Sequence, residues 1–269
     1  MNGLRQNTPL LLALCFGACG AAGATERDSR LFDGVSLAGW HVQMIADNGT
    51  RIDAASLFRP EHGVIHVYPD AADGSAQPHA ILVSDRVYTD YRVHVEYRWG
   101  RNIFAARLGQ PRDAGVLIHI TDDPPGLVKT WYRWPKSLEY QIMEGDTGSA
   151  YVLKARAVGS VDPATGRYRP VASGGVAKPV RLLGDDRTSF KLTRSEQARE
   201  RPGWNSVDIE VRGDRAVFFL NGREVNVVGD LVDDRAGPPA PMREGRIALQ
   251  AEGAEVFYRN VRLVPLKPR

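Results

Sequence analysis

Apolar residues recur at every second position in segment after segment of this chain, which is the pattern of half-buried β-strands and not of helices. In residues 91–99, five large apolar residues alternate with four charged or polar ones. Residues 116–120 form a nearly continuous apolar run, and residues 138–143 alternate again. We predict a strand in each of these segments. Only residues 194–201 and 230–235 favour short helices.

Turn signals separate further strands in the C-terminal half of the chain. Strands are predicted at 207–211, 216–220, 247–250 and 256–264, with turns at Gly213-Asp214, Asn221-Gly222 and Glu252-Gly253. The 27 glycines and 17 prolines also favour many turns and short elements. Because strands and helices do not alternate, the favoured architecture is all-β, with two antiparallel sheets packed face to face. No change in composition marks a second domain, so residues 25–269 are expected to fold as one.

Residues 155–186 interrupt the regular pattern. They are rich in glycine, proline and arginine and show little periodicity. Loops of this length inside compact domains are usually functional or mobile. The sequence therefore predicts a long loop here, directly after the most unusual polar cluster of the chain.

The first 24 residues are typical of an export signal. Arg5 supplies a short positive region, residues 9–16 are apolar, and Ala22-Gly23-Ala24 offers a cleavage site before Thr25. The alternative is a bacterial lipoprotein signal that is cleaved before Cys19, whose acylation would anchor the protein to a membrane. We thus expect an exported protein that is either periplasmic or lipid-anchored. Both cysteines lie in this segment, so the mature chain is expected to contain no disulfide and no thiol nucleophile.

Composition and charge argue against nucleic-acid binding and nucleotide chemistry. The hydrophobic fraction of 43% and charged fraction of 25% are those of an ordinary folded protein. The formal charge of +3 is spread along the chain without a basic block, which argues against nucleic acid as a partner. The sequence contains neither a phosphate-binding glycine loop nor a serine nucleophile elbow, and no zinc-binding HExxH. Nucleotide chemistry is therefore not expected.

Residues 131–148 hold the candidate chemistry. Trp131 and Trp134 lie beside Glu139 and Gln141, which the strand period places on one face. Aromatic faces cover the apolar patch of a pyranose while carboxylates and amides bond its hydroxyls, so this composition suits a sugar site. His119 falls on a different predicted strand, and an imidazole and a carboxylate that face one pocket could divide acid and base duties.

A purely structural interpretation of the same segment stays open. Glu139 could be paired with Lys136 or Arg133 on a solvated face, with the two tryptophans at the edge of the core. Asp146, in Gly-Asp-Thr-Gly, is by the same standard a turn residue.

Several motifs resemble, in order, those of the 3-keto-disaccharide hydrolase family. They are LFDGVSLAGW at 31–40, DAGVLIH at 113–119, WPKSLEYQ at 134–141, EGDTG at 144–148, GWN at 203–205 with NG at 221–222, GRIALQ at 245–250 and FYRNV at 257–261. The resemblance runs from about residue 31 to residue 266. It implies a concanavalin A-like jelly-roll β-sandwich. The chain departs from the family pattern at Asp113, Ala114, Ser149 and Glu252, where relatives often carry asparagine, serine, aspartate and histidine.

The resemblance implies cleavage of 3-keto-glycosides by removal of the C2 proton, elimination of the group at C1 and hydration. In that chemistry we expect Glu139 and His119 to act as base and acid. The remaining residues are expected to bind substrate: Gln141 and Lys136 through hydroxyls or the enolate, Trp131, Trp134 and Trp204 as sugar platforms, and Asp146 through a hydroxyl or a divalent cation. No other cofactor is expected, and the partner is a small carbohydrate. The alternatives are a lectin-like protein without catalysis and a glucanase that acts on unoxidised glucan.

Overall fold

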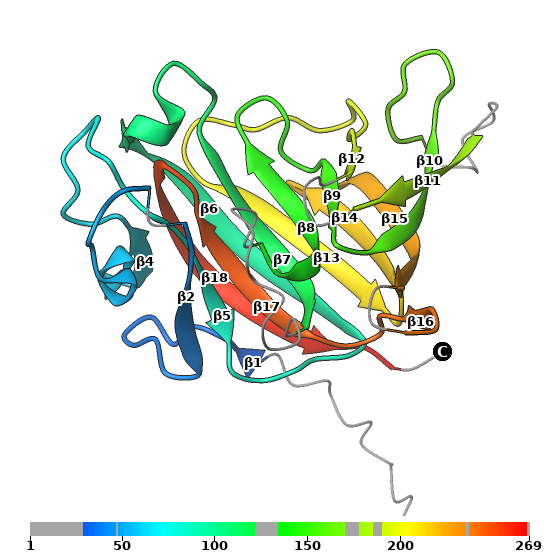
Figure 1. The fold of residues 1–269 in the computed structure, drawn as a ribbon, viewed down its shortest axis with the longest axis horizontal. Helices are drawn as coiled ribbons and strands as arrows, with labels where there is room; N and C mark the ends of the chain where they lie inside the picture. Colours follow the sequence, from blue (N-terminus) through cyan, green and yellow to red (C-terminus); the bar gives the residue numbers. More distant parts are fainter. Residues whose placement is uncertain are drawn as a thin grey trace, which may run out of the picture.

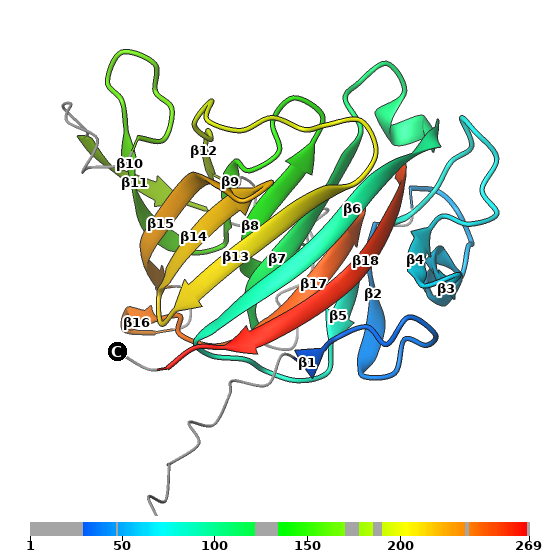
Figure 2. The ribbon, with the colours of Figure 1, turned by 180° about the vertical axis from the view of Figure 1, so that it is seen from behind.

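The computed structural model describes residues 29–46, 48–121, 134–169, 178–184, 190–234 and 237–267. They form two β-sheets that lie face to face, and Figures 1 and 2 show the two layers from opposite sides. Two short 3-10 helices, η1 (Ala54–Leu57) and η2 (Ala105–Arg107), lie in the connections. Every pairing between neighbouring strands of the described residues is antiparallel.

The smaller sheet has seven strands in the order β12-β9-β8-β7-β17-β5-β2. Its strands are β2 (Trp40–Ala46), β5 (His79–Ser84), β7 (Asp113–Thr121), β8 (Lys136–Met143), β9 (Ala150–Leu153), β12 (Phe190–Leu192) and β17 (Arg246–Ala251). Strand β17 lies between β5 and β7, so segments distant in the sequence become neighbours in the sheet.

The larger sheet follows the order β11-β10-β15-β14-β13-β6-β18-β4-β3, with β1 on β18 and β16 on β15. Its strands are β1 (Ser29–Arg30), β3 (Phe58–Glu61), β4 (Val64–Val67), β6 (Tyr91–Ile103), β10 (Arg156–Val161), β11 (Lys178–Leu183), β13 (Asn205–Arg212), β14 (Arg215–Leu220), β15 (Arg223–Asp233), β16 (Ala240–Pro241) and β18 (Ala254–Pro265).

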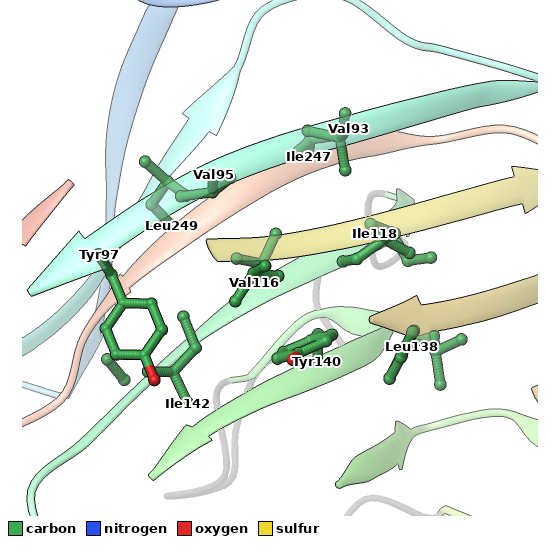
Figure 3. Packing of buried hydrophobic residues seen from close by; sticks show 14 of the residues in the cluster. Val93, Val95, Tyr97, Val116, Ile118, Leu138, Tyr140, Ile142, Ile247 and Leu249 are labelled. Atoms are coloured by element: carbon green, nitrogen blue, oxygen red, sulfur yellow. The ribbon is translucent and has the colours of Figure 1, made fainter. Parts of the chain in front are cut away.

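The hydrophobic core lies between the two sheets. Figure 3 shows how alternate residues of β6 point toward those of β7, β8 and β17, as the period of two requires. Two of the large buried tyrosines bond their hydroxyls to backbone carbonyls: that of Tyr140 donates to Phe219 O at 3.2 Å and that of Tyr258 to Gln250 O at 2.9 Å. Such pairing removes the cost of burying a hydroxyl in an apolar core.

The strands predicted from alternation are all present, but the two predicted helices are wrong. Residues 194–201 have no helix, and residues 230–233 belong to the end of β15. There, Val232 pairs with Arg156 of β10 and with Pro241 of β16. Pairing on both sides outweighs a weak local preference for helix.

The long loop predicted at 155–186 is also wrong in part. It contains β10 and β11, which pair over their whole length from Arg156↔Leu183 to Val161↔Lys178. These strands lie at the edge of the larger sheet. Several of their residues are only partly buried. The alternation of apolar and polar residues by which a strand is predicted is therefore weak in this segment.

A second apolar cluster covers the other face of the seven-stranded sheet, which we call its outer face. It contains Ile81, Val83, Leu117, Leu153 and Ala248 together with Ile45 and Ile120, and Trp134 packs against it. Residues of the same strands with the opposite parity belong to the core between the sheets. The seven-stranded sheet is therefore buried on both faces at this point. The apolar side chains of its outer face form a surface next to which a ligand site can lie.

Candidate functional site

A pocket of about 270 Å³ opens on the outer face of the seven-stranded sheet. Its polar lining comes from β7, β8, the last residue of η2 and the turn between β17 and β18, and its apolar wall comes from β8, β9 and the segment before β8. The lining residues are Arg107, Asp113, Trp134, Glu139, Gln141, Met143, Tyr151, Leu153 and Glu252. The pocket thus combines charged groups with aromatic and aliphatic surface, as small-molecule sites do.

Strand parity brings the polar side chains together. On β8, Leu138, Tyr140 and Ile142 face the core, so Glu139 and Gln141 must face outward. On β7, Gly115 lies opposite Gln141. A Cβ at Gly115 would stand 2.8 Å from Glu139 Oε1 and 2.5 Å from Gln250 Oε1. The absence of a side chain at this position is therefore what lets Glu139 and Gln250 meet across β7.

Two amide groups and one guanidinium hold the carboxyl groups of the pocket. Gln250 Nε2 donates to Glu139 Oε1 at 2.9 Å, and Gln141 Nε2 donates to Asp113 Oδ1 at 2.6 Å. Arg107 bridges two carboxylates: its Nη2 forms an ion pair with Asp113 Oδ2 and another, at 2.7 Å, with Glu252 Oε1. Both oxygens of Asp113 are thus engaged, whereas Glu139 Oε2 and Glu252 Oε2 have no hydrogen-bond partner among the described residues.

The balance of charges forces at least one proton into this pocket. Three buried carboxyl groups face a single guanidinium, so full ionisation would leave two uncompensated negative charges. Burial, followed by repulsion from Glu252, raises the pKa of Asp113 to about 8. Burial and the charges of Glu252 and Asp113 raise the pKa of Glu139 well above its usual value, and burial raises that of Glu252. Glu139 makes no ion pair among the described residues and so holds its proton most firmly. Asp113, with a pKa of about 8, is also largely protonated at neutral pH, which leaves Glu252 as the ionised partner of Arg107.

Arg107 stays charged in this setting. Burial lowers the pKa of its guanidinium, but the opposing charges of Glu252 and Asp113 outweigh that effect and raise it. A fixed cation next to two carboxylates is the arrangement that stabilises a negative charge as it develops on a bound molecule.

Three of the residues expected from the sequence meet in this pocket: Glu139, Gln141 and Trp134. The interpretation of Glu139 as a solvated residue paired with Lys136 is wrong, because Glu139 is 6% exposed and bonds to Gln250. Trp131 lies outside the described residues.

His119 lies elsewhere, so the expectation that it shares a pocket with Glu139 is wrong for this structure. A β-bulge interrupts β7 here, and His119 has a φ of 53° in the left-handed region. The ring is 1% exposed and lies near the backbone of Gly213 and Glu244, at the far end of the sandwich. Burial lowers its pKa to about 4, so the imidazole is neutral.

Lys136 also departs from its expected place. It shares the inward parity of Leu138, and its ammonium forms an ion pair with Asp233 of the opposite sheet. A buried lysine that is bonded across the core is not available to a substrate on the outer face.

Asp146 is a turn residue, as the structural interpretation holds. Its carboxylate forms an ion pair with Lys191 at 2.5 Å and accepts from Ser149 Oγ at 2.8 Å. The same Ser149 hydroxyl accepts from the backbone N–H of Arg194, so the departure from the family pattern at this position is built into the turn.

Trp204 lies immediately before β13 of the larger sheet. The guanidinium of Arg259 lies 3.9 Å from the centre of its ring, and that of Arg98 lies 5.4 Å away. The ring does not line the outer-face pocket, so Trp204 provides no platform there.

A family model described as a 3-keto-alpha-glucoside-1,2-lyase-like domain matches residues 28–264. The chain belongs to this family. The resemblance found in the motifs is thereby confirmed, and the 3-keto-disaccharide hydrolase family identifies a carbohydrate-active protein of the glycosyl hydrolase type. A search of the curated proteins finds no match.

Solved structures are similar to this 3-keto-disaccharide hydrolase family member at low identity. A candidate glycosyl hydrolase from Parabacteroides distasonis is 17% identical, with a TM-score of 0.50, and the match covers 89% of this chain and 94% of that one. The carbohydrate binding module CBM66 from Bacillus subtilis is 13% identical over 84% and 95% of the two chains, with a TM-score of 0.43. A β-glucanase from Bacillus licheniformis is 11% identical over 88% and 97%, with a TM-score of 0.42. The two antiparallel sheets and the family match confirm the predicted jelly-roll β-sandwich.

Sequence reasoning missed several residues of the site of this family member. Arg107 comes from η2 and carries no signal in the local pattern. Asp113 and Glu252 appear in the sequence only as departures from the family motifs, and the structure shows both on Arg107. Gln250 closes the motif GRIALQ, and only the pairing of β17 with β7 shows that it reaches Glu139.

Two further predictions concern a metal ion and the membrane. Among the described ranges, no group of three or more histidine, cysteine or acidic side chains is arranged to hold a metal ion, so a divalent cation stays a prediction. Within the same ranges, no helix has the length and apolar character needed to cross a membrane. The predicted export signal and both cysteines lie outside the described residues.

Proposed function

We propose that this protein cleaves the glycosidic bond of 3-keto-glycosides by elimination followed by hydration, with Glu252 as the base and Glu139 as the acid. The observation that carries the proposal is the buried set of three carboxyl groups around one guanidinium, in a family described by 3-keto-α-glucoside 1,2-lyase-like activity. Such a set contains both an ionised and a protonated carboxyl near neutral pH.

In this reaction the protein's own groups have to supply only proton transfers. A ketone at C3 acidifies the proton on C2, so a carboxylate can remove it and leave an enolate. The enolate then expels the oxygen at C1: the C1–O bond breaks, a C1=C2 double bond forms, and an acid delivers a proton to the departing oxygen. Water adds to the resulting enone, with OH at C1 and H at C2, and yields the free 3-keto sugar. General acid and base groups of this kind typically contribute about 10²–10⁴-fold each.

The free carboxylate oxygens support this division of roles between Glu252 and Glu139. Glu252 Oε1 is held by Arg107, which favours the ionised form, and its Oε2 is free to accept the C2 proton. Glu139 makes no ion pair among the described residues and retains its proton, and its Oε2 is free to donate toward the departing oxygen. The two glutamates thus have environments that differ in the way an acid and a base require.

Asp113 and Gln141 act as positioning residues. Asp113 uses both oxygens, one on Arg107 and one on Gln141, so it has none left for a proton of the substrate. It fixes Arg107 in reach of Glu252, and the guanidinium in turn supplies the positive charge that an enolate oxygen needs.

The apolar wall suits the C–H face of a sugar ring. Trp134 is half-buried against the outer cluster, and Tyr151 and Leu153 of β9 stand on the same side of the pocket. We assign the sugar platform to Trp134, since indole faces stack on pyranose rings.

The test is turnover of 3-keto-trehalose and of a 3-keto-glucoside by the wild type and by Glu139→Gln and Glu252→Gln. Each variant keeps the size of the side chain and removes the titratable proton. We expect each to lower kcat by about 10²-fold or more while it still binds substrate. Glu210→Gln, on β13 with its carboxylate on Arg212, is the matched control and should keep wild-type turnover.

Other outcomes overturn the proposal in distinct ways. Wild-type turnover in both variants removes the assigned acid and base. Saturable binding of the keto sugar without turnover by the wild type indicates a lectin-like protein on the same scaffold, and reducing ends from unoxidised glucan indicate a glucanase.

A further inference from the structure

A second cavity, of about 380 Å³, lies at one end of the sandwich. It is bounded by the end of β6, by the residue before β7, by the turn between β8 and β9, and by residues 200–203. Figure 2 shows the segment from β12 to β13, drawn in yellow, crossing this end of the two sheets. None of the residues that line this end cavity lines the outer-face pocket.

Glu200 fixes the crossing segment in place. Its Oε1 accepts from Tyr97 Oη at 2.7 Å and from Trp99 Nε1 at 3.0 Å, and its Oε2 accepts from the backbone N–H of Gly145 at 3.1 Å. Because three donors from β6 and the β8–β9 turn hold one carboxylate, the cavity is formed before any ligand arrives. Both oxygens of Glu200 are used, so its charge is directed into the protein.

The carboxylate of Glu144, the other acidic group of the cavity, is also bonded within the protein. Glu144 accepts from Arg112 twice, from the backbone N–H at 3.0 Å and from Nη2 at 2.5 Å. The Nη1 of Arg112 donates to Gly100 O at 2.7 Å, while its Nε is buried without a hydrogen-bond partner.

Arg98 and Arg201 supply the positive charge of the cavity that no carboxylate among the described residues neutralises. Within the described ranges, the guanidinium of Arg98 forms neither an ion pair nor a hydrogen bond, and it lies 4.4 Å from the ring centre of Phe257. Stacking on a ring occupies the flat face of a guanidinium and leaves the N–H groups at its edge available. Arg201 donates from Nη2 to Asn221 Oδ1 at 2.9 Å and has no carboxylate partner among the described residues.

We propose that the end cavity binds an acidic saccharide unit, with the carboxylate of a uronic acid against Arg98 and Arg201 and its ring beside Trp99. Three arginines and two internally bonded glutamates line the cavity, so its charge toward a ligand is positive. The planar fork of arginine fits a carboxylate with two parallel hydrogen bonds.

Trp99 and the neighbouring pocket favour a sugar over a bare anion. The indole of Trp99 lines the cavity with the part of its surface that the guanidinium of Arg112, 5.4 Å from the ring centre, does not cover. Arg112 and Glu144 of the end cavity are the chain neighbours of Asp113 and Met143, which line the outer-face pocket. The two cavities therefore lie on either side of the same strand ends.

The experiment is calorimetric titration of the purified protein with glucuronate, with glucose and with inorganic phosphate, at low and high salt. The variants are Arg98→Gln and the double variant Arg98→Gln/Arg201→Gln. Arg92→Gln, on the same strand and paired with Asp208, is the matched control. We expect saturable binding of glucuronate that is tighter than that of glucose or phosphate, weakens with salt, and weakens about tenfold or more in the double variant but not in the control.

Three results would overturn the inference. Glucuronate that does not bind removes the site, and equal binding by the wild type and the double variant removes the assigned arginines. Phosphate that binds as tightly as glucuronate shows an anion site without recognition of a sugar. Because binding is measured without a 3-keto substrate, failure here leaves the proposed elimination chemistry unaffected.

Discussion

Gly115→Ala tests how tightly the acid of the proposed reaction is packed. Gly115 lies in the middle of β7, and the added methyl group would stand 2.8 Å from Glu139 Oε1 and 2.5 Å from Gln250 Oε1. The φ of Gly115 is not in the left-handed region, so alanine introduces no backbone strain there. The whole effect of the substitution must come from the contact with these two side chains.

The displacement needed is large for a catalytic side chain. A carbon and a carbonyl or carboxylate oxygen are ordinarily separated by at least about 3.4 Å, so each group must move by more than about 0.5 Å. Gln250 is fully buried and Glu139 faces the pocket, so the methyl group presses on Gln250 and displaces Glu139 toward the pocket, which breaks the 2.9 Å bond between them. Overpacking of this kind costs about 1–3 kcal/mol of stability, and a misplacement on the order of 1 Å lowers turnover by about 10²-fold.

The assay is kcat/KM on a 3-keto-glucoside together with the free energy of unfolding by denaturant. The matched control is Gly229→Ala on β15, where the nearest atom to an added Cβ is Arg215 Cγ at 3.9 Å. We expect a loss of about 10²-fold in kcat/KM for Gly115→Ala and none for the control. A Gly115→Ala variant with wild-type kcat/KM would refute the assigned geometry of Glu139.

Three more predictions follow from the burial of titratable groups and from the N-terminal pattern. The folded-state pKa of Asp113, about 8, lies above the ordinary 3.8, so burial of its charge costs stability progressively as pH rises from about 4 to about 8. Asp113→Asn should show a smaller fall in the free energy of unfolding over that range than the wild type does, and equal falls would contradict the raised pKa. His119→Ala should keep kcat within about twofold for the folded fraction, since the ring does not line the pocket. The cavity that the substitution leaves should lower the melting temperature. A loss of kcat of about 10²-fold with native circular dichroism would instead show that His119 takes part in the reaction. Expression in a bacterium should yield a mature chain that begins at Thr25, as read by intact mass, whereas a lipid-modified Cys19 would support the alternative signal.

Alternation of apolar and polar residues was enough to predict the sheets, because the core between them selects one face of every central strand. It also placed Glu139 and Gln141 side by side, since both have the parity opposite to Leu138 and Tyr140. The same parity argument, applied to Lys136, would have shown that its side chain faces the core. Strands β10 and β11, the last two at one end of the larger sheet, were not predicted because several of their residues are only partly buried and the alternation is weak.

The rest of the site depends on features that no local pattern contains. The bulge in β7 turns His119 away from the outer face, and a bulge is set by pairing with two other strands. Arg107 reaches the pocket from the short 3-10 helix η2, and Glu252 lies in the turn between β17 and β18, more than a hundred residues further along the chain. A buried network of one guanidinium and three carboxyl groups becomes visible only when these segments are brought together.

The most direct test of the central claim is the position of deuterium in the product. When a 3-keto-glucoside is cleaved in D₂O, elimination and hydration should leave one deuterium at C2 of the released 3-keto sugar, above the level of an enzyme-free control, and mass spectrometry or NMR reads it. Release of the sugar without deuterium at C2 would show that the C1–O bond breaks without removal of the C2 proton, and would contradict the roles given to Glu139 and Glu252.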